Sequence, residues 1–394
     1  MKFNKWTLGL AALGVVSLAS AVRAEEAAAK IFTETAVSGT QISGYVNTSA
    51  HWNFNGYRNT LDSFGGNKAD GFNLDAVSVT ISKPLDETDW AAGYNFQMVY
   101  GQDAALVGMN DFSSDKSTIK NAYVELRAPV GNGIDLKVGV WDTILGYEGF
   151  DRGNNPNYTY SYGYLLEPTT YAGVLASYKV CDVLSVQGGV ADVANGGGGV
   201  SPASRASIDS RKTYLGSLAL TAPQSWGVLA GSTLYAGATY GATASTTGTL
   251  TGGPTGEQAN YYVGTVVNTG VKGLKVGASY DHVSVNNLNA GGANGWVNAM
   301  ALYSSFQATD KLSLHARAEY AWGNGIALAN IAGAPLGSVP AESAYAFTGT
   351  VQYDLWKNVL SRVELRWDHT KDGLQTSSGA KDAIMLAGNL IYKF

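Results

Sequence analysis

Two groups of residues in this chain have side chains and a spacing that suit the binding of polar molecules. The segment 143–168 is rich in charged and amide side chains and then places tyrosine at every second position from Tyr158 to Tyr164. In a second group, charges alternate with apolar residues, as in the stretch from Arg362 to Arg366. Closely set charges and amides can bind or sort polar solutes through electrostatics and hydrogen bonds, without any covalent step.

The sequence gives little support for covalent catalysis or for a metal site. No G-x-S-x-G, H-E-x-x-H or phosphate-loop motif accompanies the four histidines, His51, His282, His315 and His369. The one cysteine, Cys181, permits no internal disulfide and argues against a cysteine-based metal site. A lone histidine is more often a solvated polar group than a catalyst. We therefore predict no enzymatic activity, no cofactor and no metal.

The elements that must position these side chains have a period of two. Between Gln41 and Trp52, apolar or small residues alternate with polar ones, which is the pattern of a strand whose two faces meet different solvents. The same alternation returns clearly at 90–100, 134–140, 274–281 and 312–320. Weaker segments are 72–83, 118–128, 169–179, 183–193, 211–221, 229–240, 260–269, 296–307, 343–353, 359–369 and 382–394. The pattern predicts sixteen strands, and a change of parity between Ala76 and Val77 indicates a bulge or a misjudged start.

Short and long connections alternate along the chain. Seven tight turns and eight long loops join the predicted strands, as in an up-and-down antiparallel barrel with both ends on one side. Aromatic residues gather near the long-loop end at Trp52, Tyr100, Trp296, Tyr320, Trp322 and Trp367, and near the short-turn end at Trp90, Tyr178, Phe306, Tyr392 and Phe394. Two such belts are typical of barrels that cross an outer membrane. We predict an all-β transmembrane barrel with short periplasmic turns and long extracellular loops.

The start of the chain and its composition fit export to such a membrane. Lys2 and Lys5 precede an apolar run that ends at a small-residue site, so residues 1–24 are predicted to be a signal peptide. Residues 25–38 are then a periplasmic N-terminal segment, and 39–394 are the barrel. Charged residues make up only 14% of the chain, which is low for an aqueous surface. Without the predicted leader, 23 basic and 31 acidic residues give a net charge of −8, and we predict no nucleic-acid partner.

The number of strands decides what such a barrel can do. Eight strands can be filled by their own side chains, whereas sixteen leave an open lumen. The polar face would line it with Asp75, Glu125, Arg127, Asp135, Lys137, Asp281, His315, Arg317, Glu319, Arg362, Glu364, Arg366 and Asp368. We predict a porin for passive diffusion of small hydrophilic solutes, with a mild cation preference from the negative net charge. The alternatives are a saccharide-selective channel and a structural or surface-interaction barrel with a plugged lumen.

The longest connection, 143–168, is the candidate for narrowing the pore. It either folds into the lumen or lies over the mouth, and the sequence leaves both alternatives open. Its tyrosines could contact sugar rings, but a strand extension that packs them on the wall or the interface is favoured. These solute-contact candidates are Tyr158, Tyr160, Tyr162 and Tyr164. The candidate constriction residues are Glu148, Asp151, Arg152, Glu167, Arg127, Lys137, Arg317, Glu319, Arg362, Glu364 and Arg366.

Several segments resemble the OmpL-like β-barrel porins of Gram-negative bacteria. They are LKVGVWDTILGYEGFDRGNNPNYTYSYGYLLEP at 136–168, LSRVELRWDHT at 360–370 and the closing GNLIYKF. The resemblance implies a place in the cell outer membrane, contact with its lipid, and Phe394 as the signal read by the barrel assembly machinery. Similarity to sixteen-stranded general porins also implies a possible homotrimer.

Overall fold

The computed structural model describes residues 31–32, 39–54, 68, 70–107, 117–192, 211–242, 257–286, 294–324, 343–370 and 381–394. The predicted signal peptide, 1–24, lies outside these residues, and so does most of the predicted periplasmic segment, 25–38. In that segment, β1 (Ile31–Phe32) pairs with the start of the next strand, where Ile31 lies opposite Ile42.

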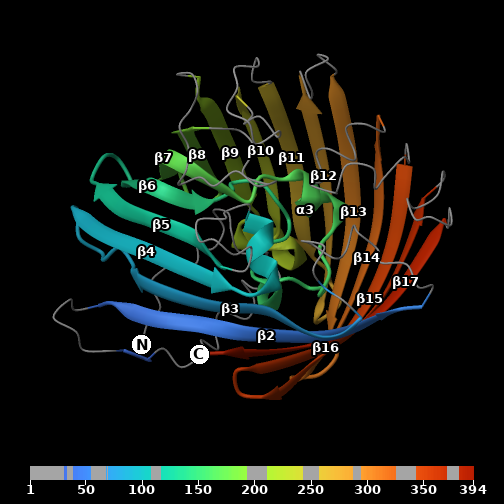
Figure 1. The fold of residues 1–394 in the computed structure, drawn as a ribbon. Helices are drawn as coiled ribbons and strands as arrows, with labels where there is room; N and C mark the ends of the chain where they lie inside the picture. The colour runs from blue at the N-terminus through green and yellow to red at the C-terminus, as the bar shows by residue number, and fades with distance from the viewer. Residues whose placement is uncertain are drawn as a thin grey trace.

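Within the described residues, sixteen strands form one closed antiparallel barrel (Figure 1). They are β2 (Gln41–Asn53), β3 (Gly71–Lys83), β4 (Ala91–Tyr100), β5 (Ser117–Ala128), β6 (Ile134–Asp142), β7 (Thr170–Lys179), β8 (Leu184–Ala191), β9 (Thr213–Thr221), β10 (Thr233–Ala242), β11 (Glu257–Asn268), β12 (Leu274–Val285), β13 (Gly295–Gln307), β14 (Leu312–Gly323), β15 (Ser343–Trp356), β16 (Val359–Thr370) and β17 (Asp382–Lys393). Each pairs with the next along the chain, and β17 closes the ring by pairing with β2, where Leu386 lies opposite Trp52. The predicted sixteen-stranded barrel is confirmed.

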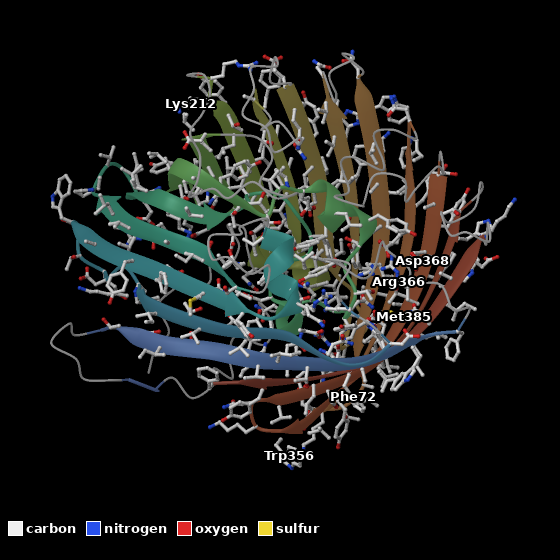
Figure 2. All side chains as sticks on the ribbon, viewed as in Figure 1. Phe72, Lys212, Trp356, Arg366, Asp368 and Met385 are labelled. Carbon is white, nitrogen blue, oxygen red and sulfur yellow. The ribbon has the colours of Figure 1, made fainter. Side chains whose placement is uncertain are left out.

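Alternate side chains on each strand meet two different environments. On β16, Val363 and Leu365 are 58% and 52% exposed on the outer surface, whereas Glu364 and Arg366 are fully buried inside. Figure 2 shows the same contrast between Phe72, which projects from the outer surface, and Arg366, which lies within the ring of strands. Lipid requires every backbone polar group to be paired, and a closed barrel meets this requirement while it turns its apolar face outward.

The predicted aromatic belts lie on the outer surface. Trp52, Tyr100 and Trp296 are exposed at the long-loop ends of their strands, and Trp90 and Tyr392 are exposed at the short-turn end. Aromatic rings at both heights fit the two interfaces of a bilayer, because one side of such a ring prefers hydrocarbon and the other tolerates water.

A β-bulge interrupts β3 where the sequence changes parity. Asn47 of β2 lies opposite Ala76, but the next residue, Thr48, lies opposite Leu74, so Asp75 has no direct partner. Asp75 and Ala76 are consequently both buried inside the barrel, at 0% and 1% exposure. The structure therefore decides for a bulge over a misjudged strand start, and the bulge directs an extra carboxylate into the lumen.

The connection between β9 and β10 differs from the prediction. A strand was expected to start at residue 229, but η3 (Gln224–Leu229) occupies this part, and β10 starts at Thr233. Gly227 has φ of 59° and Gly231 has φ of 76°, both in the left-handed region that glycine adopts without strain. These two glycines turn the backbone away from the extended form, which an apolar sequence alone does not reveal.

Three short helices lie toward the inside of the barrel. They are η1 (Gln102–Val107), η2 (Arg152–Asn154) and α3 (Tyr162–Leu166). Figure 1 shows α3 within the ring of strands, and it contacts β12, β13 and β14. Among the described helices, none has the length and apolar character needed to cross a membrane.

Candidate functional site

The connection between β6 and β7, residues 143–169 and here called the inner loop, folds into the lumen. The side chain of Asn157 donates to Thr350 Oγ1 of β15 at 2.7 Å, and Lys393 of β17 donates to the carbonyl of Gly153 at 3.0 Å. Farther along the loop, Tyr162 Oη donates to Asp368 Oδ1 of β16 at 2.6 Å. Of the two alternatives left open by the sequence, the structure therefore selects the loop inside the barrel.

An ionic centre on β14 binds the middle of the inner loop. Arg317 forms ion pairs of 2.7 Å with Glu148 of the loop and with Glu319 of its own strand, and all three side chains have 0% exposure. The two carboxylates accept backbone N–H groups of the loop, Glu148 from Ser161 at 2.7 Å and Glu319 from Tyr162 at 2.6 Å. Charged groups this deeply buried are stable only when every polar atom is paired, and the loop backbone supplies the pairs.

Strand β16 binds the loop backbone in the same way. Glu364 accepts the N–H groups of Tyr158 and Thr159 at 2.6 and 2.9 Å. Arg362 donates to the carbonyl of Arg152 at 2.8 Å, and Arg366 donates to a carbonyl farther along the loop, at residue 160. Because a strand has a period of two, Arg362, Glu364 and Arg366 all point inward. They bind successive residues of the inner loop. The alternating charges of β16 thus hold the loop.

A second ionic network joins other loops to the inner loop. Arg152 pairs with Asp103 of η1 at 2.8 Å, and Asp103 also pairs with Lys68 at 2.7 Å. Lys68 in turn pairs with Asp75, the bulged residue of β3, at 2.8 Å. Burial disfavours the Asp103 carboxylate, but Arg152 and Lys68 outweigh this effect and lower its pKa to about 2. Sequence reasoning missed Lys68 and Asp103, because both lie in loops where no periodicity marks them.

The four loop tyrosines are buried against cations and against each other. Arg152 lies 4.1 Å from the ring centre of Tyr160, and Arg366 lies 5.3 Å from that of Tyr162. The rings of Tyr160 and Tyr164 stack at 4.0 Å.

The expected strand extension is wrong: the segment ends in α3, whose start is capped by Ser161. A helix forms because the capping hydroxyl and the inward apolar contacts outweigh the alternating pattern. The solute-contact role of these tyrosines stays a prediction that their burial does not favour.

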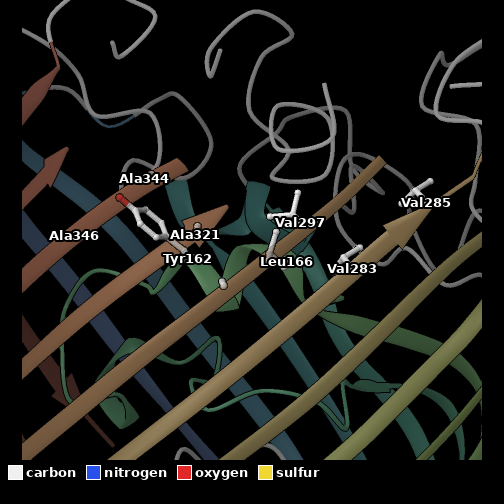
Figure 3. Packing of buried hydrophobic residues seen from close by; sticks show 9 residues of the cluster. Tyr162, Leu166, Val283, Val285, Val297, Ala321, Ala344 and Ala346 are labelled. Carbon is white, nitrogen blue, oxygen red and sulfur yellow. The ribbon is translucent and has the colours of Figure 1, made fainter. Parts of the chain in front are cut away.

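Apolar contacts fix the end of the inner loop. Tyr162 and Leu166 of α3 pack on small apolar side chains that point inward from four strands, as Figure 3 shows. These wall residues are Val283, Val285, Val297, Ala299, Ala321, Ala344 and Ala346. At the other end of the loop, Ile144 and Leu145 pack on Trp141, Tyr171, Leu175, Ala191, Leu215 and Tyr262. The inner wall is therefore apolar where it meets the two ends of the inner loop, which the prediction of a polar inner face did not foresee.

The structure brings most candidate residues together and leaves two apart. Nine of them lie in or against the inner loop: Glu148, Asp151, Arg152, Glu167, Arg317, Glu319, Arg362, Glu364 and Arg366. Arg127 instead pairs with Asp135 at 2.7 Å, and Lys137 lies over the ring of Tyr123 at 4.9 Å, both nearer the short turns. Lys120, paired with Asp142 at 2.6 Å, and Lys393 were not anticipated.

Nearer the short turns, part of the inner wall on β5, β6, β8, β10 and β12 is polar and in contact with solvent. The inward side chains of Glu125, Lys137, Gln187, Tyr235 and Lys275 are neither buried nor fully exposed. Such groups keep contact with water, whereas the charges beside the inner loop are sealed. The inner loop therefore occupies part of the lumen, and the inward side chains on this part of the wall stay partly exposed.

The comparisons with known proteins agree with this architecture. A family profile described as "Putative beta-barrel porin-2, OmpL-like" matches residues 39–394. Among solved structures, the chain is similar to an anion-selective porin from Comamonas acidovorans, with 13% identity, a TM-score of 0.58, and coverage of 90% of this chain and 99% of that one. It is also similar to the outer membrane channel DcaP of Acinetobacter baumannii, with 13% identity, a TM-score of 0.58, and coverage of 92% and 99%. In-vitro folded OmpT of Vibrio cholerae in its trimer form gives 11% identity, a TM-score of 0.55, and coverage of 90% and 99%.

At these identities the solved structures show a shared fold. No curated protein sequence matches the chain. The family profile, however, spans the entire barrel from its first strand to its last residue. This chain therefore belongs to the OmpL-like β-barrel porin family.

Proposed function

We propose that this outer-membrane porin is a passive channel for small hydrophilic solutes, in which the inner loop sets the size limit. The observation that carries the proposal is the position of that loop. It is bound to β14, β15 and β16 by hydrogen bonds and packs by Ile144 and Leu145 on the wall around β6 to β9. These two groups of strands lie on opposite sides of a sixteen-stranded ring, so the loop crosses the lumen.

The charges beside the loop favour selection by size over selection by chemistry. Glu148, Arg317 and Glu364 bind each other or the loop backbone, and each is sealed from water. A solute would have to break these bonds before it could form its own, which is costly because it leaves a buried charge without its partner. The buried tyrosines likewise offer no free ring face to a sugar. A general diffusion channel is therefore favoured over a saccharide-selective one.

We also propose that the barrel carries no catalytic site. His282 Nδ1 is hydrogen-bonded to Asn298 Oδ1 at 2.8 Å, and His369 Nδ1 to Asp382 Oδ1 at 2.9 Å, both on the outer face near the long loops. The rings of both histidines lie beside aromatic rings of the outer belt. Hydrogen bonds and ring contacts of this kind support a structural role in that belt.

We further propose that three copies assemble in the membrane. The support is the solved neighbour OmpT of Vibrio cholerae, which is described in its trimer form. We expect outer-membrane lipid to cover the rest of the apolar outer face, and the barrel assembly machinery to read Phe394. Native mass spectrometry of the detergent-extracted protein tests the assembly, and a mass of one chain alone would count against it.

Two measurements on the purified, refolded protein test the channel. In planar bilayers we expect stepwise conductance, and in liposome swelling we expect rates that fall with solute size and are equal for sugars and amino acids of similar size. The matched control is the same protein after heat unfolding, which should give neither signal.

The other hypotheses predict different results. Swelling rates that depend on the kind of sugar at constant size would favour the saccharide-selective channel. The complete absence of conductance steps from folded protein would remove the channel and favour a structural barrel with a plugged lumen.

A further inference from the structure

Two acids attach the end of the inner loop to the barrel wall. Glu167 follows the last residue of α3, and Asp281 points inward from β12. Helix α3 contacts β12, and Gly163 of α3 lies against the Asp281 carboxyl, so Glu167 at the end of this short helix meets Asp281 and is hydrogen-bonded to it. An ionised carboxylate can only accept hydrogen bonds, so one of the two groups must carry a proton for this bond to exist.

The surroundings of the two carboxyl groups are closely packed. One oxygen of each group, Glu167 Oε2 and Asp281 Oδ2, is closed to solvent and accepts no hydrogen bond from a described N–H or O–H donor. A Cβ placed on Gly146 would lie 2.2 Å from Glu167 Oε2, and one placed on Gly163 would lie 2.3 Å from Asp281 Oδ2. Each acid therefore packs against a glycine of the inner loop, where a side chain would not fit. Within the described part of the chain, no three His, Cys, Asp or Glu side chains converge as metal ligands.

The neighbouring groups increase the repulsion in this pair. Glu148 of the inner loop acts on both carboxyl groups with a charge of the same sign. The other titratable neighbours are the phenols of Tyr164 on α3 and of Tyr262 on β11. Burial, followed by the nearby Asp281, raises the pKa of Glu167 well above its usual value. Glu148 itself pairs with Arg317, which also pairs with Glu319.

We propose that Glu167 and Asp281 share one proton and act as positioning residues, forming a pH-sensitive latch that holds the inner loop against β12. The latch deepens the proposed function, because it rests on the inner loop being the constriction of the channel. Its consequence is that the width of the channel is steady while the shared proton is present and fluctuates when the proton is lost.

The direction of the pH effect follows from proton linkage. The attached loop binds more protons than the released loop, in which both acids meet water and ionise at their ordinary values. Attachment is therefore strongest at acidic pH and weakens as the pH rises above the ordinary range of a glutamate. Once the shared proton is gone, two like charges face each other in a dry site, and α3 separates from β12.

Single-channel recording between about pH 6 and about pH 9 tests the latch. In the wild type we expect brief transitions between conductance levels to become more frequent with pH, by up to about tenfold per unit while the pair titrates. Asp281→Asn should remove this dependence, because the amide donates to Glu167 at every pH. Glu125→Gln is the control: it removes another inward carboxyl, one on β5 that keeps contact with water, and should keep the wild-type profile.

A second measurement decides the question without relying on conduction. Hydrogen exchange of residues 158–167, corrected for the intrinsic pH dependence, should rise between about pH 6 and about pH 9 in the wild type and stay level in Asp281→Asn. Glu167→Gln replaces Asp281→Asn if the latter does not fold. Equal pH profiles for wild type and variant, or a level wild-type profile, would overturn the latch. Absence of conductance at every pH would refute the proposed channel, whereas the exchange data would still decide the latch.

Discussion

Gly44 of β2 and Phe394 at the end of the chain exchange two backbone hydrogen bonds, each of 2.9 Å. The Phe394 ring lies over the glycine on the outer face, so that a Cβ at Gly44 would be 2.7 Å from Cζ of the ring and 2.2 Å from the carbonyl oxygen of Ser78. These contacts extend the seam between β17 and β2 where the barrel closes. The last residue and the first barrel strand are thus fitted to each other.

Gly44→Val should weaken this closure. The new side chain must displace the ring of Phe394 or bend β2, and overpacking of this kind costs about 1 to 3 kcal/mol. The free energy of unfolding, from urea titrations in lipid vesicles followed by tryptophan fluorescence, measures the loss. Gly349→Val on β15 is the matched control, since a Cβ there meets no atom within 4 Å. Equal losses at both glycines would show that the contact with Phe394 is unimportant.

Arg317→Met should loosen the inner loop. The substitution leaves Glu148 and Glu319, both fully buried, without their nearest cation. Removing one partner of a buried ion pair costs about 3 to 5 kcal/mol, and the loop can lower this cost by moving into water. Single-channel recording should therefore show a larger and noisier conductance than in the wild type.

The comparison for this prediction is Arg127→Met. Arg127 and Asp135 also form a pair of 2.7 Å, but their side chains are 14% and 10% exposed and lie near the short turn between β5 and β6. Conductance should change little in this variant. An unchanged conductance in Arg317→Met would mean that the loop does not depend on the ionic centre of β14.

The strands could be predicted from the sequence because each one has two faces in different solvents. The alternation from Val359 to Thr370 survives in the structure as apolar outward and charged inward positions. Even the bulge at Asp75 could be detected in the sequence, because a bulge shifts the parity of every residue after it. Pairing between neighbouring strands then needs no further information, because each strand pairs with the next.

The contents of the lumen could be predicted only in part. The inward charges of β14 and β16 follow from parity, but their partners are backbone groups of the inner loop, which carry no sequence signal. Val297 and Ala344 point inward and are apolar because α3 covers them. A period of two does not distinguish an inner wall covered by a helix from one that faces water. Lys68 and Asp103 come from loops, where only the folded structure brings them to Arg152.

Lys275→Glu should shift the ion preference of the channel toward cations. Lys275 points inward from β12 near the short turns, on the part of the wall that keeps contact with water. A charge on a wetted wall acts directly on ions that pass, whereas the buried charges near the inner loop largely cancel. The reversal potential in a salt gradient measures the shift. Lys357→Glu, at an exposed turn between β15 and β16, should shift it much less.

Asp103→Asn should lower stability at neutral pH and remove part of its pH dependence. The pKa of Asp103 is about 2 in the folded protein, below its ordinary value of 3.8. Its ion pairs with Lys68 and Arg152 therefore contribute stability that is present above the ordinary value and is lost as the pH falls through about 2. The shift corresponds to about 2 kcal/mol. The free energy of unfolding should thus fall between about pH 4 and about pH 2 in the wild type and fall less in the variant.

The control for this prediction is Asp182→Asn, whose ion pair with Lys179 is exposed and which should behave like the wild type. A variant that matches the wild type at neutral pH would mean that the network of Lys68, Asp103 and Arg152 does not hold the inner loop.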